Sequence, residues 1–272
     1  MINRVIIIGD SHIVPFKKAF ESLHFDCGTE YIFLPFKYIK ARSSGFIVNH
    51  RLEYKKIIDK KNHSFYSTSG FESSDNSDEI HCIPLENSKV YLVGMGLGVD
   101  ALLRNFSEDG TLNHEKCVNF PIYSSQAVKY SLATDLRDFT IYQDDFVDDL
   151  IRTSVHKSKS FRLYKNFIEN GFSLIELLPL PLVSFASLAY YSRSDLNLIP
   201  SELYIYSIQR WLDCISKETA IINPFKLIDE RHLSKSVLLM DGETYSVRAS
   251  DIHMSIEACK MAVKYIHASL AG

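Results

Sequence analysis

The sequence lacks several features that would assign it to a special class of protein. No run approaches the roughly 20 apolar residues that a membrane-spanning helix requires. The most apolar stretch, 174–191, is interrupted by Glu176, Pro179 and Pro181. The formal net charge is only -3 over 272 residues, which gives no electrostatic reason to expect a nucleic-acid or anionic-membrane partner. We therefore expect a protein without a membrane span and without nucleic acid as its partner.

Cysteine is also scarce, and its spacing excludes a disulfide framework. The chain has five cysteines, an odd number, and no Cys-x-x-Cys pair. They are Cys27, Cys82, Cys117, Cys214 and Cys259. This pattern favours reduced, buried thiols in a cytoplasmic protein. The apolar run near Met1 is too short for a signal peptide and leads straight into a turn, which agrees with that interpretation.

Strands and helices are predicted to alternate along the chain. The β-branched run 5–8 is typical of a strand buried on both faces, and a helix is expected from about Val14. Helices are also expected over much of 125–170, ending at Gly171, and at 201–217 and 254–268. Alternation of this kind predicts an α/β domain with a mainly parallel sheet. Further strands are expected at 31–34, 90–93, 173–178 and 220–223, with short strands or hairpins at 46–48, 54–58, 64–66 and 80–84.

The first predicted strand stops at the sequence Gly9-Asp10-Ser11-His12. Gly9 permits a tight turn, so the hydroxyl of Ser11 is expected at the carboxyl end of a central strand, just before a helix. Open α/β sheets bind their ligands at that end. Backbone N–H groups and the positive end of the helix dipole gather there, so Ser11 is the most functional-looking position in the chain.

A serine needs a base to act as a nucleophile at neutral pH, and His253 is the best candidate. It lies in Ser250-Asp251-Ile252-His253-Met254, just before the last predicted helix. A loop leading into that helix can open at the same edge of the sheet as Ser11, and Asp251 could orient the imidazole. The alternative is that Asp251 caps the helix and that His253 is a surface residue.

Together, these two blocks resemble the SGNH/GDSL hydrolase superfamily. The Gly-Asp-Ser block corresponds to the family's nucleophile turn, and Asp-x-His near the carboxyl terminus is similar to its Asp-x-x-His block. The resemblance implies one domain over residues 1–272, a three-layer α/β/α sandwich with a mainly parallel sheet. Irregular insertions are expected at about 36–89 and 107–170. It also implies Ser11 as nucleophile, His253 as base and no cofactor.

The sequence departs from the family pattern at two places. The acid stands two residues before the histidine, so Asp251 completes a triad with a shifted backbone, or the enzyme works as a Ser-His dyad. The family's oxyanion Asn is replaced by Gly98, in Gly96-Leu97-Gly98.

Backbone N–H groups could take over that role. Gly45 is the first candidate for a second-block glycine and Gly70 its rival, while Asp10 and His12 are expected to line the pocket. The glycine-rich run 94–98 fits a phosphate-binding loop poorly, because it lacks both Gly-x-Gly-x-x-Gly and Gly-Lys-Ser/Thr. Close packing of this turn beside Ser11 is the favoured interpretation.

The resemblance implies a serine esterase or O-acetyltransferase that acts on an O-acetyl ester of a carbohydrate, with water or a sugar hydroxyl as acceptor. For a transferase, an acyl donor is a further partner. The alternative is a catalytically degraded protein of the same fold that binds carbohydrate or serves in assembly. Two members of the acidic group Asp144, Asp145, Asp148 and Asp149 could share a metal, but a helix start or solvated face is the favoured interpretation. The oligomeric state is open.

Overall fold

The structure is a computed structural model of the chain. The residues that it describes are 2–9, 13–25, 28–36, 39, 45–55, 80–95, 122–130, 141–179, 201–221 and 256–270. Among them, no helix is long and apolar enough to cross a membrane.

A mainly parallel α/β sheet forms the centre of the molecule, as the alternation of strands and helices predicts. Its four strands lie in the order β2-β1-β6-β9, and all their pairings are parallel. A parallel bridge joins Leu177 to Ile221, and the Leu177 N–H donates to the Ala220 carbonyl at 2.8 Å. Residues 220–221 of the strand expected at 220–223 therefore lie beside β9, and 222–223 lie outside the described residues. The strand bounds are β1 Arg4–Gly9, β2 Glu30–Pro35, β6 Ser88–Met95 and β9 Ile175–Pro179.

The central strand β1 is buried on both faces, which confirms the prediction from its β-branched run. Val5 and Ile7 belong to one apolar cluster, while Ile6 and Ile8 belong to the other. All four side chains have 0 % exposure. Each such burial contributes about 1.5–3 kcal/mol, so the position of β1 is firmly fixed.

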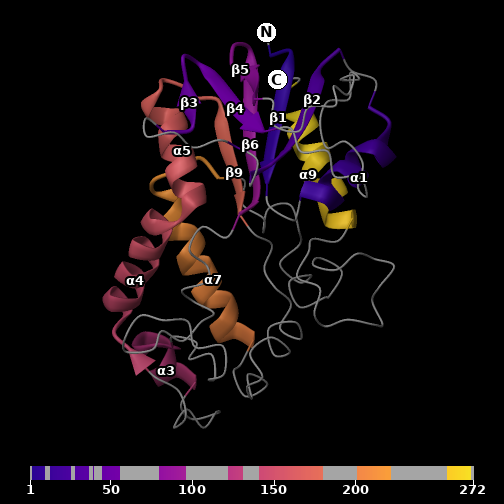
Figure 1. Cartoon of the computed structure of the whole chain (residues 1–272). Coiled ribbons are helices and arrows are strands. Elements are labelled where there is room, and N and C mark those ends of the chain that lie inside the picture. The colour runs from indigo at the N-terminus through magenta and orange to yellow at the C-terminus, as the bar shows by residue number, and fades with distance from the viewer. Residues whose placement is uncertain are drawn as a thin grey trace.

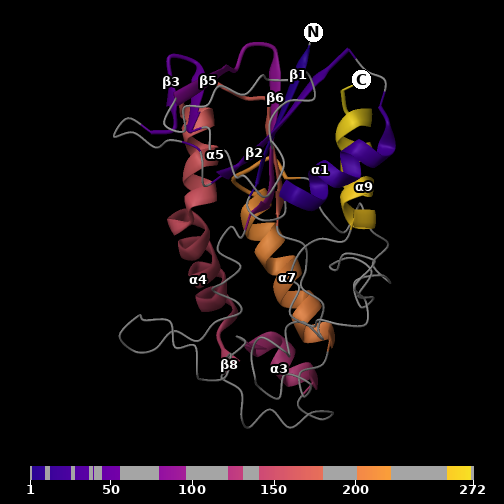
Figure 2. The same ribbon diagram turned by 45° about the vertical axis from the view of Figure 1, so that its right-hand side comes forward.

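One face of the sheet is covered by α1 (Ile13–Leu23) and α9 (Ile256–Ala268), which lie against each other. Figure 2 shows both helices on the same side of the strands. The inward stripe of α9 is the predicted one, since Cys259, Val263 and Ile266 have 0 % exposure. Helices from the two ends of the described chain therefore share one core with the strands between them.

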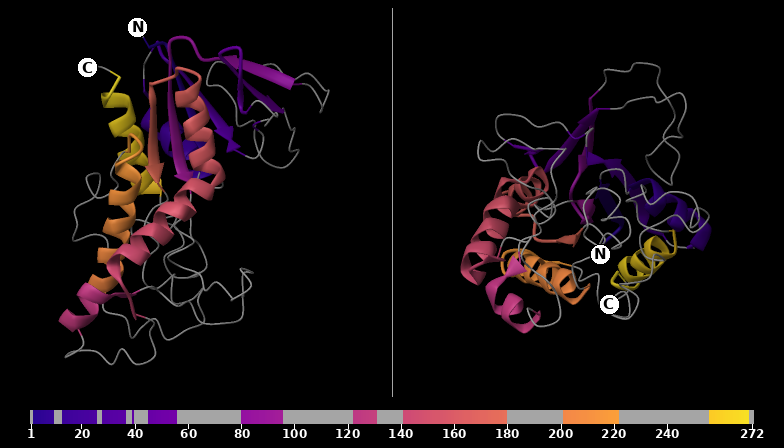
Figure 3. Two further views of the ribbon diagram at one scale, coloured as in Figure 1. Left: turned by 90° about the vertical axis from the view of Figure 1, so that its left-hand side faces the viewer. Right: turned by 90° about the horizontal axis from the view of Figure 1, so that it is seen from below.

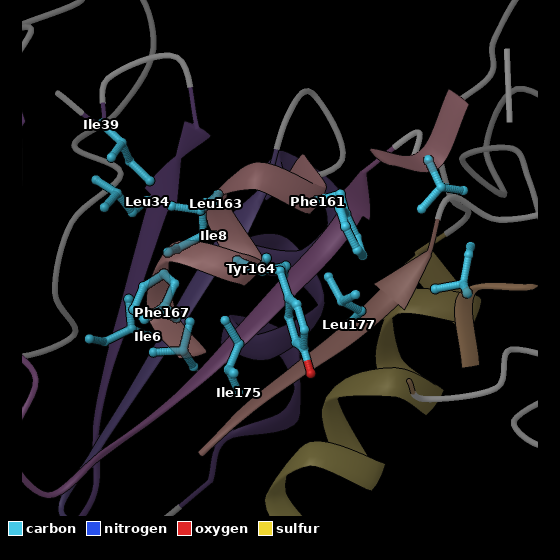
Figure 4. Packing of buried hydrophobic residues seen from close by; sticks show 14 of the residues in the cluster. Ile6, Ile8, Leu34, Ile39, Phe161, Leu163, Tyr164, Phe167, Ile175 and Leu177 are labelled. Carbon is cyan, nitrogen blue, oxygen red and sulfur yellow. The ribbon is translucent and has the colours of Figure 1, made fainter. Parts of the chain in front are cut away.

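The other face is covered by α5 (Lys159–Glu169) and α7 (Ser201–Ser216), with α4 (Asp144–Lys157) leading into α5. Figure 4 shows the side chains of α5 over those of β1 and β9. In Figure 3, left, the beginnings of α4 and α7 extend past the carboxyl ends of the strands.

Two smaller sheets lie outside the main one. The region expected to be irregular, 36–89, contains an antiparallel sheet of β3 (Ile47–Val48), β4 (Arg51–Lys55) and β5 (Ile80–Pro84). β5 has the predicted bounds, whereas β4 begins three residues before the predicted strand at 54, and the strand expected at 64–66 lies outside the described residues. Within the second expected insertion, 107–170, β7 (Ile122–Tyr123) pairs with β8 (Ile141–Tyr142), and α3 (Ser124–Tyr130) lies between them in the chain.

The expectation of buried thiols is confirmed for two of the three cysteines that the structure describes. Cys214 and Cys259 are buried, as expected, whereas Cys82 is exposed, and none of these three forms a disulfide. Burial raises the pKa of the Cys214 thiol, with the Asp148 carboxylate as the next cause. Cys27 and Cys117 lie outside the described residues.

Candidate functional site

The carboxyl end of β1 is the point where the chain order of the sheet reverses. From β1 the chain passes through α1 to β2 on one side, and the next strand of the main sheet, β6, lies on the other side of β1. In open α/β sheets with this order, ligands bind in the crevice at such a switch point. The topology thus selects the end of β1, at Gly9, as the candidate site.

Close packing at this point requires a glycine. Gly9 pairs with Val93 in the parallel register. A Cβ atom on Gly9 would lie 2.7 Å from the Val93 carbonyl oxygen and 2.9 Å from its Cγ2. Gly9 is therefore needed for the approach of β1 to β6, and not only for the turn that follows.

The described residues flank the proposed nucleophile turn but do not include it. Asp10, Ser11 and His12 lie outside them, between Gly9, which ends β1, and Ile13, which begins α1. Ile13 is buried together with Val93 in the apolar cluster on this face. Strand end and helix start are thus where the sequence predicts them, and the ligands or catalytic role of Ser11 stay a prediction.

The far end of α9 is fixed at the amino edge of the sheet. Just after the helix, the Ser269 hydroxyl shares a 2.8 Å hydrogen bond with the Tyr91 hydroxyl and accepts a longer one, 3.4 Å, from Lys89 Nζ. His267 Nδ1 shares a 2.9 Å hydrogen bond with the Tyr31 hydroxyl. Burial opposes the charge on Lys89, but hydrogen bonds to Tyr91 and Glu176 outweigh it and raise the Lys89 pKa.

It follows that α9 runs antiparallel to the strands and begins at their carboxyl edge. The helix has 13 residues, and at 1.5 Å per residue it spans about 20 Å, which is close to the length of β1. Ile256 packs on the cluster that contains Ile13 and Val93. His253 and Asp251 lie outside the described residues, three and five positions before the first residue of this helix.

The end of β6 next to Gly9 is irregular. The register with β9 shifts between Val93 and Met95, so Gly94 is an extra residue, and its φ of +62° lies in the left-handed region. Gly96 and Gly98, the proposed oxyanion segment, lie outside the described residues. The bulge was not expected from the glycine-rich run, although the glycine at 94 was the available signal.

Gly45, the proposed second-block glycine, is packed against α5. Its φ is +112°, and a Cβ there would collide with the side-chain amide of Asn166. Asn166 Oδ1 accepts hydrogen bonds from the N–H groups of Phe46 and Ile47, at 2.8 and 3.0 Å. These contacts give Gly45 a role in packing, and its oxyanion role stays a prediction. Its rival Gly70 lies outside the described residues.

The acidic group on α4 has structural partners. Asp144 accepts hydrogen bonds from Ser124 and Ser125 of α3, and Asp148 accepts them from Tyr123 and Arg210. α4 begins at Asp144, so the predicted helix start is confirmed.

This network joins α3 and β7 to α4 and α7. It could not be predicted from local pattern, because Asp148 and Arg210 are 62 residues apart. Burial, reinforced by the Asp148 carboxylate, raises the pKa of Tyr123. In the part of the chain that the structure describes, no three His, Cys, Asp or Glu side chains are grouped to hold a metal ion.

Comparisons with known proteins neither support nor contradict these assignments. No family model matches the chain, and no curated protein or solved structure matches it significantly.

Proposed function

We propose that the chain is a serine esterase or O-acetyltransferase of the SGNH/GDSL type. The observation that carries this proposal is the position of Gly9, at the carboxyl end of the central strand and at the switch point of the sheet. The sequence Asp10-Ser11-His12 follows it directly, and α1 begins at Ile13. A nucleophilic serine in this family occupies a turn between such a strand and such a helix.

The arrangement of the whole sheet supports the same family fold, a three-layer α/β/α sandwich with a flavodoxin-like strand order. The strands follow the order β2-β1-β6-β9, and the bridge at Ile221 adds the start of another strand beside β9. Each face of the sheet has its own apolar cluster and its own helices. We propose a single domain over residues 1–272, in which 36–89 and 107–170 are insertions.

In the proposed reaction, the Ser11 Oγ attacks the carbonyl carbon of an acyl ester. An Oγ–C bond forms, the carbonyl electron pair moves to the oxygen, and His253 takes the hydroxyl proton. When the carbonyl re-forms, the C–O bond to the alcohol breaks and His253 returns the proton to that alcohol. Water or a sugar hydroxyl then repeats the sequence on the acyl-enzyme. Asp251 or a backbone carbonyl orients the imidazole.

The proposed substrate is an O-acetyl ester of a carbohydrate, as the family resemblance implies. The start of α9 supports His253 as the base, because this helix begins at the edge where β1 ends. The proposed protein needs no cofactor.

Release of acetate tests the proposal. Purified protein is assayed with p-nitrophenyl acetate and with a panel of O-acetylated sugars, beside Ser11→Ala and His253→Ala. We expect acetate release that both substitutions lower by about 10³-fold or more, the scale seen when a catalytic-triad member is removed. Asp251→Asn separates a triad from a dyad, since a dyad retains its rate.

Matched controls come from the same chain. Ser22→Ala removes a hydroxyl from α1 whose bond goes to the Ala19 carbonyl, and His156→Ala removes an exposed imidazole paired with Glu218. Both should retain the rate. A folded wild type that binds an O-acetylated sugar without releasing acetate would instead support the alternative, a degraded carbohydrate-binding or assembly protein.

A further inference from the structure

Gly94 forms a bulge at the place where β6 extends beyond its neighbour. β1 pairs with β6 as far as Gly9 with Val93, and β6 continues to Met95. On the other side, Val93 pairs with Leu178 and Met95 with Pro179, which leaves Gly94 as the additional residue. The bulge is therefore one residue past the pairing of Gly9 with Val93.

Two properties suggest that the bulge at Gly94 has a role beyond ending β6. Bulges are rare between parallel strands, and they gather beside active sites, where they change the direction of the chain. The φ of +62° at Gly94 lies in the region that L-residues with a side chain seldom adopt. The backbone direction at the end of β6 thus depends on a glycine at this position.

We propose that Gly94 is a positioning residue for the reaction of Ser11. Its left-handed conformation sets the direction in which the chain leaves β6, at the edge of the sheet where the proposed oxyanion forms. This inference rests on the proposed function and deepens it. In the family, an Asn side chain supplies a hydrogen-bond donor to the oxyanion. Here we assign the placement of the donor to the bulge at Gly94.

The chemistry of the segment explains why direction matters here. Gly98 stands where the family has its oxyanion Asn and has no side chain to donate. A side-chain donor can rotate toward the oxyanion, whereas a backbone N–H points where the chain directs it. Loss of one oxyanion donor lowers the rate by about 10²–10³, so a misdirected segment should lower kcat by a measurable part of that range.

The experiment compares three variants of the full chain in hydrolysis of p-nitrophenyl acetate. Gly94→Ala disfavours the left-handed conformation, and Gly94→Asn retains it better, because Asn tolerates this region. The matched control is Gly171→Ala, at the exposed end of α5. Gly171 has a φ of +77° and would bring its new Cβ within 4 Å of nothing, so it introduces a similar backbone strain far from the site.

We expect kcat to be highest in the wild type, lower in Gly94→Asn and lowest in Gly94→Ala, with the alanine change costing about tenfold or more. KM and the pH midpoint of kcat/KM should stay unchanged, since substrate binding and the base are unaffected. Gly171→Ala should retain its kcat within about twofold, because surface changes of this kind act on stability.

Each other result overturns the inference. If Gly94→Ala keeps the wild-type kcat, or if Gly171→Ala loses as much, Gly94 has no positioning role and the proposed function stands. If Gly94→Ala fails to fold, Gly94→Asn decides: a lower kcat at an unchanged pH midpoint supports the inference, and a wild-type kcat refutes it. A wild type that releases no acetate contradicts both proposals.

Discussion

Replacement of Gly9 by alanine should separate the two central strands at the candidate site. The new Cβ would lie 2.7 Å from the Val93 carbonyl oxygen, whereas an ordinary close C···O contact is about 3.3 Å. β1 and β6 must then part by about 0.6 Å, since a backbone oxygen cannot rotate away as a side chain does. Overpacking of this kind costs about 1–3 kcal/mol, and a loss of about 2 kcal/mol lowers Tm by about 4–8 °C.

Urea denaturation and thermal unfolding measure this cost. Gly28→Ala is the matched control, because a Cβ there meets nothing within 4 Å. It should be neutral or stabilise by up to about 1 kcal/mol through the unfolded chain. A Gly9→Ala variant as stable as Gly28→Ala would show that close packing of β1 against β6 does not require glycine at the end of β1.

Contacts elsewhere in the molecule support three further predictions. Gly45→Ala and Asn166→Ala should each lower the free energy of unfolding by about 1–3 kcal/mol. The double variant should lose less than the sum of the two, because removal of the Asn166 amide relieves the clash with the new Cβ. Strict additivity in urea denaturation would contradict this coupling. Burial alone would raise the pKa of the Asp144 carboxyl, but hydrogen bonds from two serines of α3 hold it below its usual value. The stability from that carboxyl is thus present above about pH 4 and lost as the pH falls further, and carboxyl NMR titration checks the direction of the shift. Among the described thiols, exposed Cys82 should react with a thiol reagent far faster than buried Cys214, and equal rates in the native protein would refute the burial.

Elements that depend on local pattern were predictable from the sequence. The β-branched run of β1 and the apolar stripe of α9 each carry their own periodicity, and both elements lie within about two residues of their expected bounds. Gly171 ends α5 as expected, with a φ of +77°. The break between α4 and α5 at Ser158 was missed, although its hydroxyl accepts from the Phe161 N–H as a helix cap. Serine is a favoured N-cap residue, so Ser158 itself was the signal available.

Features that depend on distant parts of the chain could not be predicted. The Asn166 side chain accepts hydrogen bonds from the backbone at 46–47, about 120 residues away in the chain, and Asp148 pairs with Arg210, 62 residues away. No local pattern marks such partners. The order of the sheet was open for the same reason. Strand order, in turn, is what makes the end of β1 a switch point, so the sequence identified the candidate serine and the fold identified the edge at which its turn begins.

Covalent labelling shows most directly whether Ser11 is a reactive nucleophile. The folded wild type is treated with a fluorophosphonate at neutral pH, and the modified peptide is located by mass spectrometry. We expect one phosphonylated residue, Ser11, with labelling abolished by Ser11→Ala and greatly reduced by His253→Ala. A folded wild type that stays unlabelled, or that is labelled at another serine, would contradict this expectation.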